Sequence, residues 1–363
     1  MTSLSWRRIS VLLALTLAPG LAFGQGRITN AKTETRPVTQ SLEREVQSVA
    51  ARGGASWIGY RAPMVAGPRQ MCCYDTISSS SPGGSCCGQC RLEGGSGVTM
   101  SQTDSRVSLE PPTEFIVLAR VESGSVMRLR TFTPDCDIDA AGMPLVWLSD
   151  VKPDDSVAWL SGLVTGMPET GDPHERVAKP ALAAVAMHNV PAADRALESF
   201  VAPNRAEWLR ADTTFWLGNS RGEAGARLLT RIITQDPSEK VRDKATFGLS
   251  VSKQPSALKA LIDAARGDTS TRVRGQALFW LAHKAGQQAV AAIAGAIEND
   301  PETEVKKKAV FALSQLPKDE GVPMMIQVAR TNRNPEVRKQ AMFWLGQSKD
   351  PRAVKFFEDI LTK

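Results

Sequence analysis

Histidine is scarce in this 363-residue sequence, and cysteine is confined to one stretch of it. The three histidines are His174, His188 and His283, and all six cysteines lie between Cys72 and Cys136. No H-E-x-x-H, G-x-S-x-G or phosphate-loop motif occurs, and no Ser/His/Asp or Cys/His spacing is legible. We therefore expect no catalytic residue, no metal and no cofactor, and we favour a non-enzymatic function.

Long apolar runs are absent too, apart from a short one at the N-terminus. A basic pair and an apolar segment over residues 7–17 precede small residues at Ala22 and Gly24. This pattern is typical of a secretory signal peptide over residues 1–24, and the apolar run is too short to span a bilayer comfortably. An uncleaved anchor is the less favoured alternative. We expect an exported protein, periplasmic or secreted, that does not span a membrane after signal removal.

The composition excludes wholesale disorder, because 42% of the residues are hydrophobic and 23% are charged. The formal charge of +6 is unevenly divided: residues 25–169 carry a net −3, whereas residues 170–363 carry a net +7. A basic protein raises the question of nucleic acid. Export makes nucleic acid an unexpected partner, and the basicity belongs to the C-terminal half alone.

A period of 32 residues governs the sequence from residue 172 onward. In each unit an apolar residue is followed by an alanine or threonine four positions later and by Val or Leu eight positions later, so the three share one helix face. Small residues at the same spacing mark a second helix. We expect a mainly α fold, a right-handed α-solenoid of six 32-residue helix pairs over residues 172–363. The first apolar residues of the units are Val177, Leu209, Val241, Val273, Val305 and Val337.

Each unit also has a predicted start signal for its first helix. Asp or Asn stands five residues before the first apolar position, and such side chains accept hydrogen bonds from free amides of a first helical turn. We therefore expect these residues to be N-caps: Asp172, Asn204, Asp236, Asp268, Asp300 and Asn332.

Three segments of the repeats carry a family resemblance. They begin at Val241, Val305 and Val337 and read VRDKATFGL, VKKKAVFAL and VRKQAMFWL. They resemble HEAT-like repeats of the type also found in phycobilisome lyases, and the resemblance covers residues 172–363. It implies a generic protein-binding scaffold and supplies no catalytic residues. The N-terminal half carries no comparable resemblance.

A basic column follows the first apolar position of five units. Its side chains either pair with an Asp near a neighbouring turn, which we favour, or form a basic track for an anionic partner. We call Arg210, Arg242, Arg274, Lys306 and Arg338 the arginine column.

A phenylalanine column stands six residues after the first apolar position. At about 100° per residue this position faces away from the buried stripe. Neighbouring helices either cover these rings, or the rings form an exposed ridge that binds a partner. The column consists of Phe215, Phe247, Phe279, Phe311 and Phe343, and the next position alternates large and small residues: Trp216, Gly248, Trp280, Ala312 and Trp344.

The N-terminal half is expected to be a separate small α+β module. We expect a polar linker over residues 25–40, the module itself over 41–150, and a capping helix with its connector over 151–171. An apolar stripe predicts a helix that starts near Leu42, and β-rich runs over 114–121 and 126–132 predict a hairpin.

The cysteines lie in this module. An even number of cysteines in an exported module predicts disulfides. The alternative is a zinc or redox site, since two of the cysteines have the C-x-x-C spacing. The disulfide candidates are Cys72, Cys73, Cys86, Cys87, Cys90 and Cys136.

These observations predict an exported, non-catalytic scaffold of the cell envelope that binds another protein through the arginine and phenylalanine columns. Self-association is a further possibility, because an acidic module could meet a basic solenoid of a second copy. The alternative is a metal or redox protein, or an enzyme, that uses the cysteine cluster. A chromophore binder has only the fold analogy in its favour.

Overall fold

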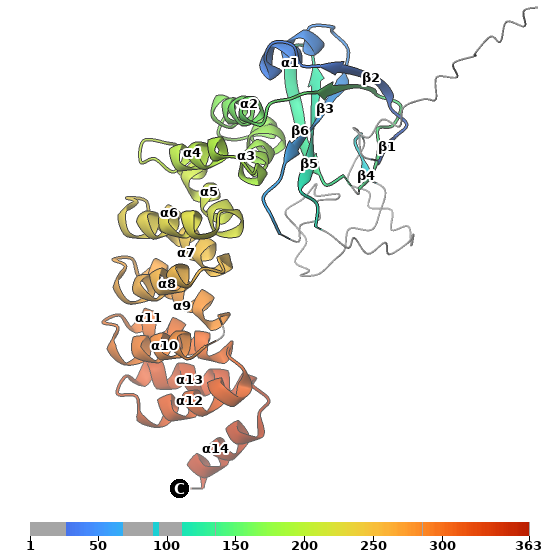
Figure 1. Cartoon of the computed structure of the whole chain (residues 1–363). Coiled ribbons are helices and arrows are strands. Elements are labelled where there is room, and N and C mark those ends of the chain that lie inside the picture. Colours follow the sequence, from blue (N-terminus) through green and yellow to red (C-terminus); the bar gives the residue numbers. More distant parts are fainter. Residues whose placement is uncertain (1–26, 68–89, 94–110, 135, 285, 363) are drawn as a thin grey trace, which may run out of the picture.

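The computed structural model describes residues 27–67, 90–93, 111–134, 136–284 and 286–362. A β-sheet module is followed by a stack of helix pairs that extends away from it (Figure 1). The expected fold class, a small α+β module before an α-solenoid, is therefore confirmed. Within these described ranges, no helix is long and apolar enough to cross a membrane.

The main sheet of the module has five strands in the order β2-β8-β3-β5-β6. Strands β3, β5 and β6 pair antiparallel, whereas β8 runs parallel to both β2 and β3. The inner strands are rich in β-branched and aromatic residues and are almost wholly buried, as expected for strands covered on both faces. The bounds are β2 (Lys32–Pro37), β3 (Ser56–Pro63), β5 (Glu114–Glu122), β6 (Ser125–Phe132) and β8 (Pro144–Ser149).

Each face of this sheet has its own apolar cover. Helix α1 (Leu42–Ala50) packs on the face that carries Val117 and Ala119. The opposite face carries Trp57 and packs on a small sheet of order β1-β7-β4. The bounds of the small sheet are β1 (Arg27–Thr29), β4 (Cys90–Arg91) and β7 (Asp137–Asp139).

The expectation of a linker over residues 25–40 is wrong, because the chain forms β1 and β2 there. Strand β2 is almost entirely exposed and lies at the edge of the sheet, where backbone pairing with β8 holds it in place. Its side chains are polar, since they bury little. Hydrophobic alternation, the usual signal of a strand, is therefore missing from the sequence.

The module is joined to the helices by hydrogen bonds and by helix α2 (Pro153–Gly166). Just after β3, the Val65 amide donates to the Met187 carbonyl at 2.8 Å, and the Asn189 amide donates to the Pro63 carbonyl at 3.0 Å. Helix α2 contacts α1 on one side and the first repeat on the other. The predicted capping helix is thus present, and it lies between sheet and solenoid.

A buried polar chain crosses the same junction. The Tyr60 hydroxyl lies 2.8 Å from Ser156 Oγ, and Ser156 Oγ lies 2.9 Å from His188 Nε2. His188 Nδ1 lies 2.7 Å from the carbonyl of Ala184, which can only accept, so this nitrogen carries the proton. The three side chains are fully buried. They connect β3, α2 and the C-terminal end of α3.

The expected helix pairs follow one another without interruption. The first apolar residues of the six units are all buried, which explains why the helices stack on this face. The first pair begins with a short π-helical turn, η1 (His174–Ala178), which continues into α3 (Lys179–Met187) and is followed by α4 (Pro191–Phe200). The others are α5 (Glu207–Ser220) with α6 (Gly222–Gln235), α7 (Glu239–Val251) with α8 (Pro255–Gly267), α9 (Thr271–Ala282) with α10 (Gln287–Asn299), α11 (Thr303–Ser314) with α12 (Lys318–Thr331), and α13 (Pro335–Gln347) with α14 (Pro351–Leu361).

In three units the first helix is capped by a side chain that lies two residues after the predicted N-cap. Ser238, Ser270 and Asn334 cap α7, α9 and α13, and each accepts a hydrogen bond from an amide of the first turn. The Asp or Asn two residues earlier ends the preceding helix instead. Its Oδ1 accepts from the amide two residues on, for example from Ser238 to Asp236 at 2.9 Å.

Candidate functional site

The arginine column is used inside the solenoid at three of its five positions. Arg210 donates through Nε and Nη2 to both carboxylate oxygens of Asp236, at 2.8 and 3.1 Å. Arg242 binds Asp268 and Arg274 binds Asp300 in the same two-pronged way. These ion pairs are largely buried. The side-chain hydrogen bonds to Asp268 and Asp300 raise the pKa of Arg242 and Arg274, so both stay fully charged.

The last two members of the column depart from this pattern. Lys306 donates to the carbonyl of Glu298 at 2.7 Å, and Asn332 stands where the partner carboxylate would be. Arg338 donates to the carbonyls of Asn332 and Arg333. The column as a whole therefore serves packing between repeats, the alternative that the sequence favoured.

The phenylalanine column forms one continuous series of ring contacts with the three tryptophans beside it. Phe215 and Phe247 stack at 5.7 Å, and Phe279 and Phe311 stack at 6.1 Å. Trp280 and Trp344 bridge these stacks, through contacts of 4.7 Å with Phe247 and 4.9 Å with Phe311. We call this series the aromatic ladder; in order along the solenoid its rings are Trp216, Phe215, Phe247, Trp280, Phe279, Phe311, Trp344 and Phe343.

The exposure of the aromatic ladder lies between the two alternatives that the sequence left open. Phe215, Phe247, Phe279 and Phe311 are half-buried, since neighbouring rings cover part of each one. Phe343, at the far end, is 54% exposed. The ladder is thus both a packing element and an apolar strip on the surface.

The alternation of large and small residues has a packing reason. A Cβ at Gly218 would strike the backbone carbonyl of Gly248, and a Cβ at Gly248 would strike that of Thr214. Helices α5 and α7 therefore approach closely. Small residues at 248 and 312 also leave room for the tryptophan of the next repeat to reach back over the preceding phenylalanine. The interdigitated packing that the sequence suggests is present.

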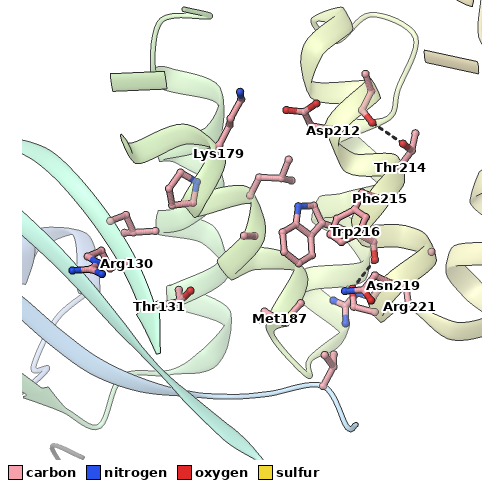
Figure 2. Close-up of a pocket in the computed structure, with 18 of the residues that line it drawn as sticks. Arg130, Thr131, Lys179, Met187, Asp212, Thr214, Phe215, Trp216, Asn219 and Arg221 are labelled. Atoms are coloured by element: carbon pink, nitrogen blue, oxygen red, sulfur yellow. Dashed lines mark hydrogen bonds between the residues drawn. The ribbon is translucent and has the colours of Figure 1, made fainter. Parts of the chain in front are cut away.

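The aromatic ladder begins inside a large hollow of about 2640 Å³ between the sheet and the solenoid. Edge strand β6 forms one wall, α3 the middle, and α5 with α7 and the connection after it the other wall (Figure 2). Met127 on β6 is 47% exposed in this hollow. The lining of the hollow includes Met127, Thr131, Met187, Phe215, Trp216 and Phe247.

Charged residues surround the apolar lining of the hollow. Figure 2 shows Asp212 in the middle of α5 and Arg221 just after its last residue, with Phe215 and Trp216 between them. Arg221 lies 3.3 Å from Asp194 and donates to the His188 carbonyl, so it is part of the junction. The hollow is therefore an apolar surface with a polar rim.

The repeats match a known family. The model for HEAT repeats matches residues 226–313 and 290–363. Residues 226–363 are HEAT repeats. The resemblance seen in the sequence is confirmed for this part of the chain, and no curated protein matches.

Solved structures add three similar proteins. Human deoxyhypusine hydroxylase is 15% identical over 57% of this chain and 89% of its own, with a TM-score of 0.25. The complex of CpcE and CpcF of phycocyanin lyase from Nostoc sp. is 24% identical over 42% and 98%, with a TM-score of 0.31. Kap95p with RanGDP is 15% identical over 54% and 30%, with a TM-score of 0.35. All three likenesses are weak.

The cysteine predictions fall mostly outside the described residues. Cys72, Cys73, Cys86 and Cys87 lie there. Cys136 is buried, with its Sγ 3.3 Å from Thr133 Oγ1. The disulfides therefore stay a prediction. Among the residues that the structure describes, no group of three or more His, Cys, Asp or Glu side chains could hold a metal ion.

Sequence reasoning missed two features of this region. Ser156 and His188 lie at hydrogen-bonding distance, an arrangement that serves catalysis elsewhere, but neither is accessible to a substrate here. Burial lowers the pKa of His188 to about 4. The hollow was also missed, because its walls come from segments about a hundred residues apart, and no local pattern joins them.

Proposed function

We propose that this protein is an exported, non-catalytic scaffold that binds another protein through the hollow and the aromatic ladder. The observation that carries the proposal is the unbroken apolar strip that leads from the hollow to Phe343 at the far end of the solenoid. HEAT repeats in the same segment support it, since such repeats are generic binding surfaces.

Partner binding can be probed at two positions where a substitution leaves the half-buried ladder contacts in place. Met127 lies on the β6 wall of the hollow, and Phe343 lies at the exposed end of the aromatic ladder. Replacing either residue by the photoreactive p-benzoylphenylalanine keeps the site apolar. Lys259, exposed on α8 and paired with Asp263, is the matched control.

Irradiation of producing cells should cross-link the same partner from position 127 and from position 343, and none from position 259. The cross-linked bands are compared by gel electrophoresis and mass spectrometry. Identical bands from all three positions, or none from 127 and 343, would refute the proposal.

Export is tested separately, by sequencing the N-terminus of the protein isolated from the exported fraction. We expect Gln25 as the first residue, because Gly24 ends the predicted cleavage site. A protein that keeps Met1 in the cytoplasmic fraction would contradict export and leave the binding proposal standing.

A further inference from the structure

A second column of side chains runs beside the aromatic ladder. The residue three positions before each phenylalanine lies next to it on the same helix face. At α7 and α11 this residue is Lys244 and Lys308, and both are exposed and form no ion pair with the residues that the structure describes. The repeats between and around them have Asp212, Gln276 and Gln340.

One of these two lysines, Lys308, packs its side chain against the preceding repeat. The side chain of Lys308 extends across to the preceding repeat, where a Cβ on Gly275 would stand 3.0 Å from Nζ. Glycine at 275 thus makes room for the lysine between α9 and α11. The ammonium therefore lies against α9, about one helical turn before the ladder rings Phe279 and Phe311 in both helices.

Further positive charge lies beyond the C-terminal ends of three helices that carry the ladder. Exposed lysines stand in the connections after α7 and α13, at Lys253 and Lys349, and at the first residue of α12, Lys318. Two acidic side chains on the same helices as the ladder lysines are already paired: Asp243 with Arg272 and Glu304 with Lys307. From Lys244 to Lys308 the ladder is therefore an apolar strip beside two cations, and the partner that complements this stretch is acidic and apolar.

The distance between Lys244 and Lys308 determines how long a bound segment must be to contact both. Helices α7, α9 and α11 pack side by side. Packed helices lie about 8–10 Å apart, so two repeats separate Lys244 from Lys308 by roughly 20 Å. An extended chain rises about 3.3 Å per residue, which makes this roughly six residues. Because six is even, acidic side chains at that spacing point to the same side of an extended segment.

We infer that the aromatic ladder binds an extended segment of a partner protein, with two acidic side chains about six residues apart on Lys244 and Lys308 and apolar side chains between them on the rings. The inference rests on the proposed function and names the chemistry of its partner. The two lysines occur in alternate repeats, those with a small residue at position 248 or 312.

The test uses the full chain and two labelled peptides of identical composition. In the first, two glutamates stand six positions apart, with leucines two and four positions after the first glutamate. In the second, the glutamates stand five positions apart and face opposite sides. Affinity is measured by fluorescence anisotropy against wild type, against Lys244→Glu/Lys308→Glu, and against the control Lys355→Glu/Arg266→Glu, whose residues are exposed on α14 and α8.

The first peptide should bind wild type and the control about tenfold more tightly than it binds Lys244→Glu/Lys308→Glu, and about tenfold more tightly than the second peptide binds wild type. Circular dichroism checks that the variants fold. Equal affinity of both peptides, or unchanged binding by Lys244→Glu/Lys308→Glu, would overturn the inference.

The remaining outcomes are equally decisive. Lys-dependent binding of a single-stranded DNA oligonucleotide or of anionic phospholipid vesicles, without binding of the first peptide, would overturn a protein partner for this face. If cross-linking from Met127 and Phe343 succeeds while the charge reversals change nothing, the proposed function stands and the acidic spacing falls.

Discussion

Each paired arginine of the arginine column holds two turns of the solenoid together. Arg274 binds the carboxylate of Asp300 in the next turn, and its Nη1 donates to the carbonyl of Asp268 in the turn before its own helix. Asp300 in turn accepts from the amide of Glu302. The polar groups that this packing buries are therefore satisfied, and loss of one member leaves the others unpaired.

Replacing Arg274 by Met should lower the free energy of unfolding by about 3 kcal/mol, because the carboxylate of Asp300 stays buried without its partner. Arg272→Met on the same helix is the matched control. Its ion pair with Asp243 is 3.3 Å long and its side chain is 62% exposed, so we expect a change below about 1 kcal/mol. Urea unfolding measures both, and equal losses would show that the buried pair has no special role.

The sequence predicts that these aspartates stand at helix boundaries, but it assigns them to the wrong end. The residue type of Asp236, Asp268 and Asp300 predicts a helix start, but each ends one helix and pairs with an arginine 26 residues earlier. A single residue type fits both roles, and only the position of the neighbouring turn decides between them. Ser238 and Ser270, the actual caps, carry the signal that would have corrected the prediction.

At the scale of elements, the close contact of α5 with α7 depends on two glycines. Gly218→Ala should cost about 2 kcal/mol, since its Cβ strikes the backbone of Gly248 and no side-chain rotation relieves the clash. In contrast, Gly295→Ala in α10 meets nothing within 4 Å and should stabilise the protein by about 0.5–1 kcal/mol. Thermal unfolding of both variants tests this, and a neutral Gly218→Ala would contradict the close approach.

Elements with a strong apolar period could be predicted, and those held by backbone pairing could not. The helices follow from apolar residues four and eight positions apart, whereas β2 exposes nearly all its side chains. The aromatic ladder shows the same limit. The sequence placed its phenylalanines on the outward face, but the stacking that half-buries them depends on the distance between repeats.

At the scale of the molecule, the junction between module and solenoid should weaken in mild acid. Burial lowers the pKa of His188 to about 4, and Arg221 acts in the same direction, whereas a histidine of an unfolded chain has a pKa of about 6.5. Between these values the unfolded chain takes up a proton that the folded chain does not. The contribution of neutral His188 to the free energy of unfolding is therefore complete above about pH 6.5. It is lost as the pH falls toward 4, by up to about 3 kcal/mol.

The variant His188→Gln removes this titration and should flatten the dependence of the urea midpoint on pH between about 6.5 and 4.5. His283→Gln, at an exposed position, is the control and should keep the wild-type slope. A slope that survives in His188→Gln would place the pH dependence elsewhere in the protein.

The hollow and the aromatic ladder belong to the whole molecule, because no single repeat contains them. The central claim is that they form one continuous binding surface, and carbene footprinting of the protein in the fraction where it resides, against the purified protein, tests it most directly. We predict protection of Met127, Trp216, Phe247 and Phe343 and unchanged labelling of helices α6, α8 and α10. Unchanged labelling of the four residues, or protection confined to α6, α8 and α10, would contradict the account.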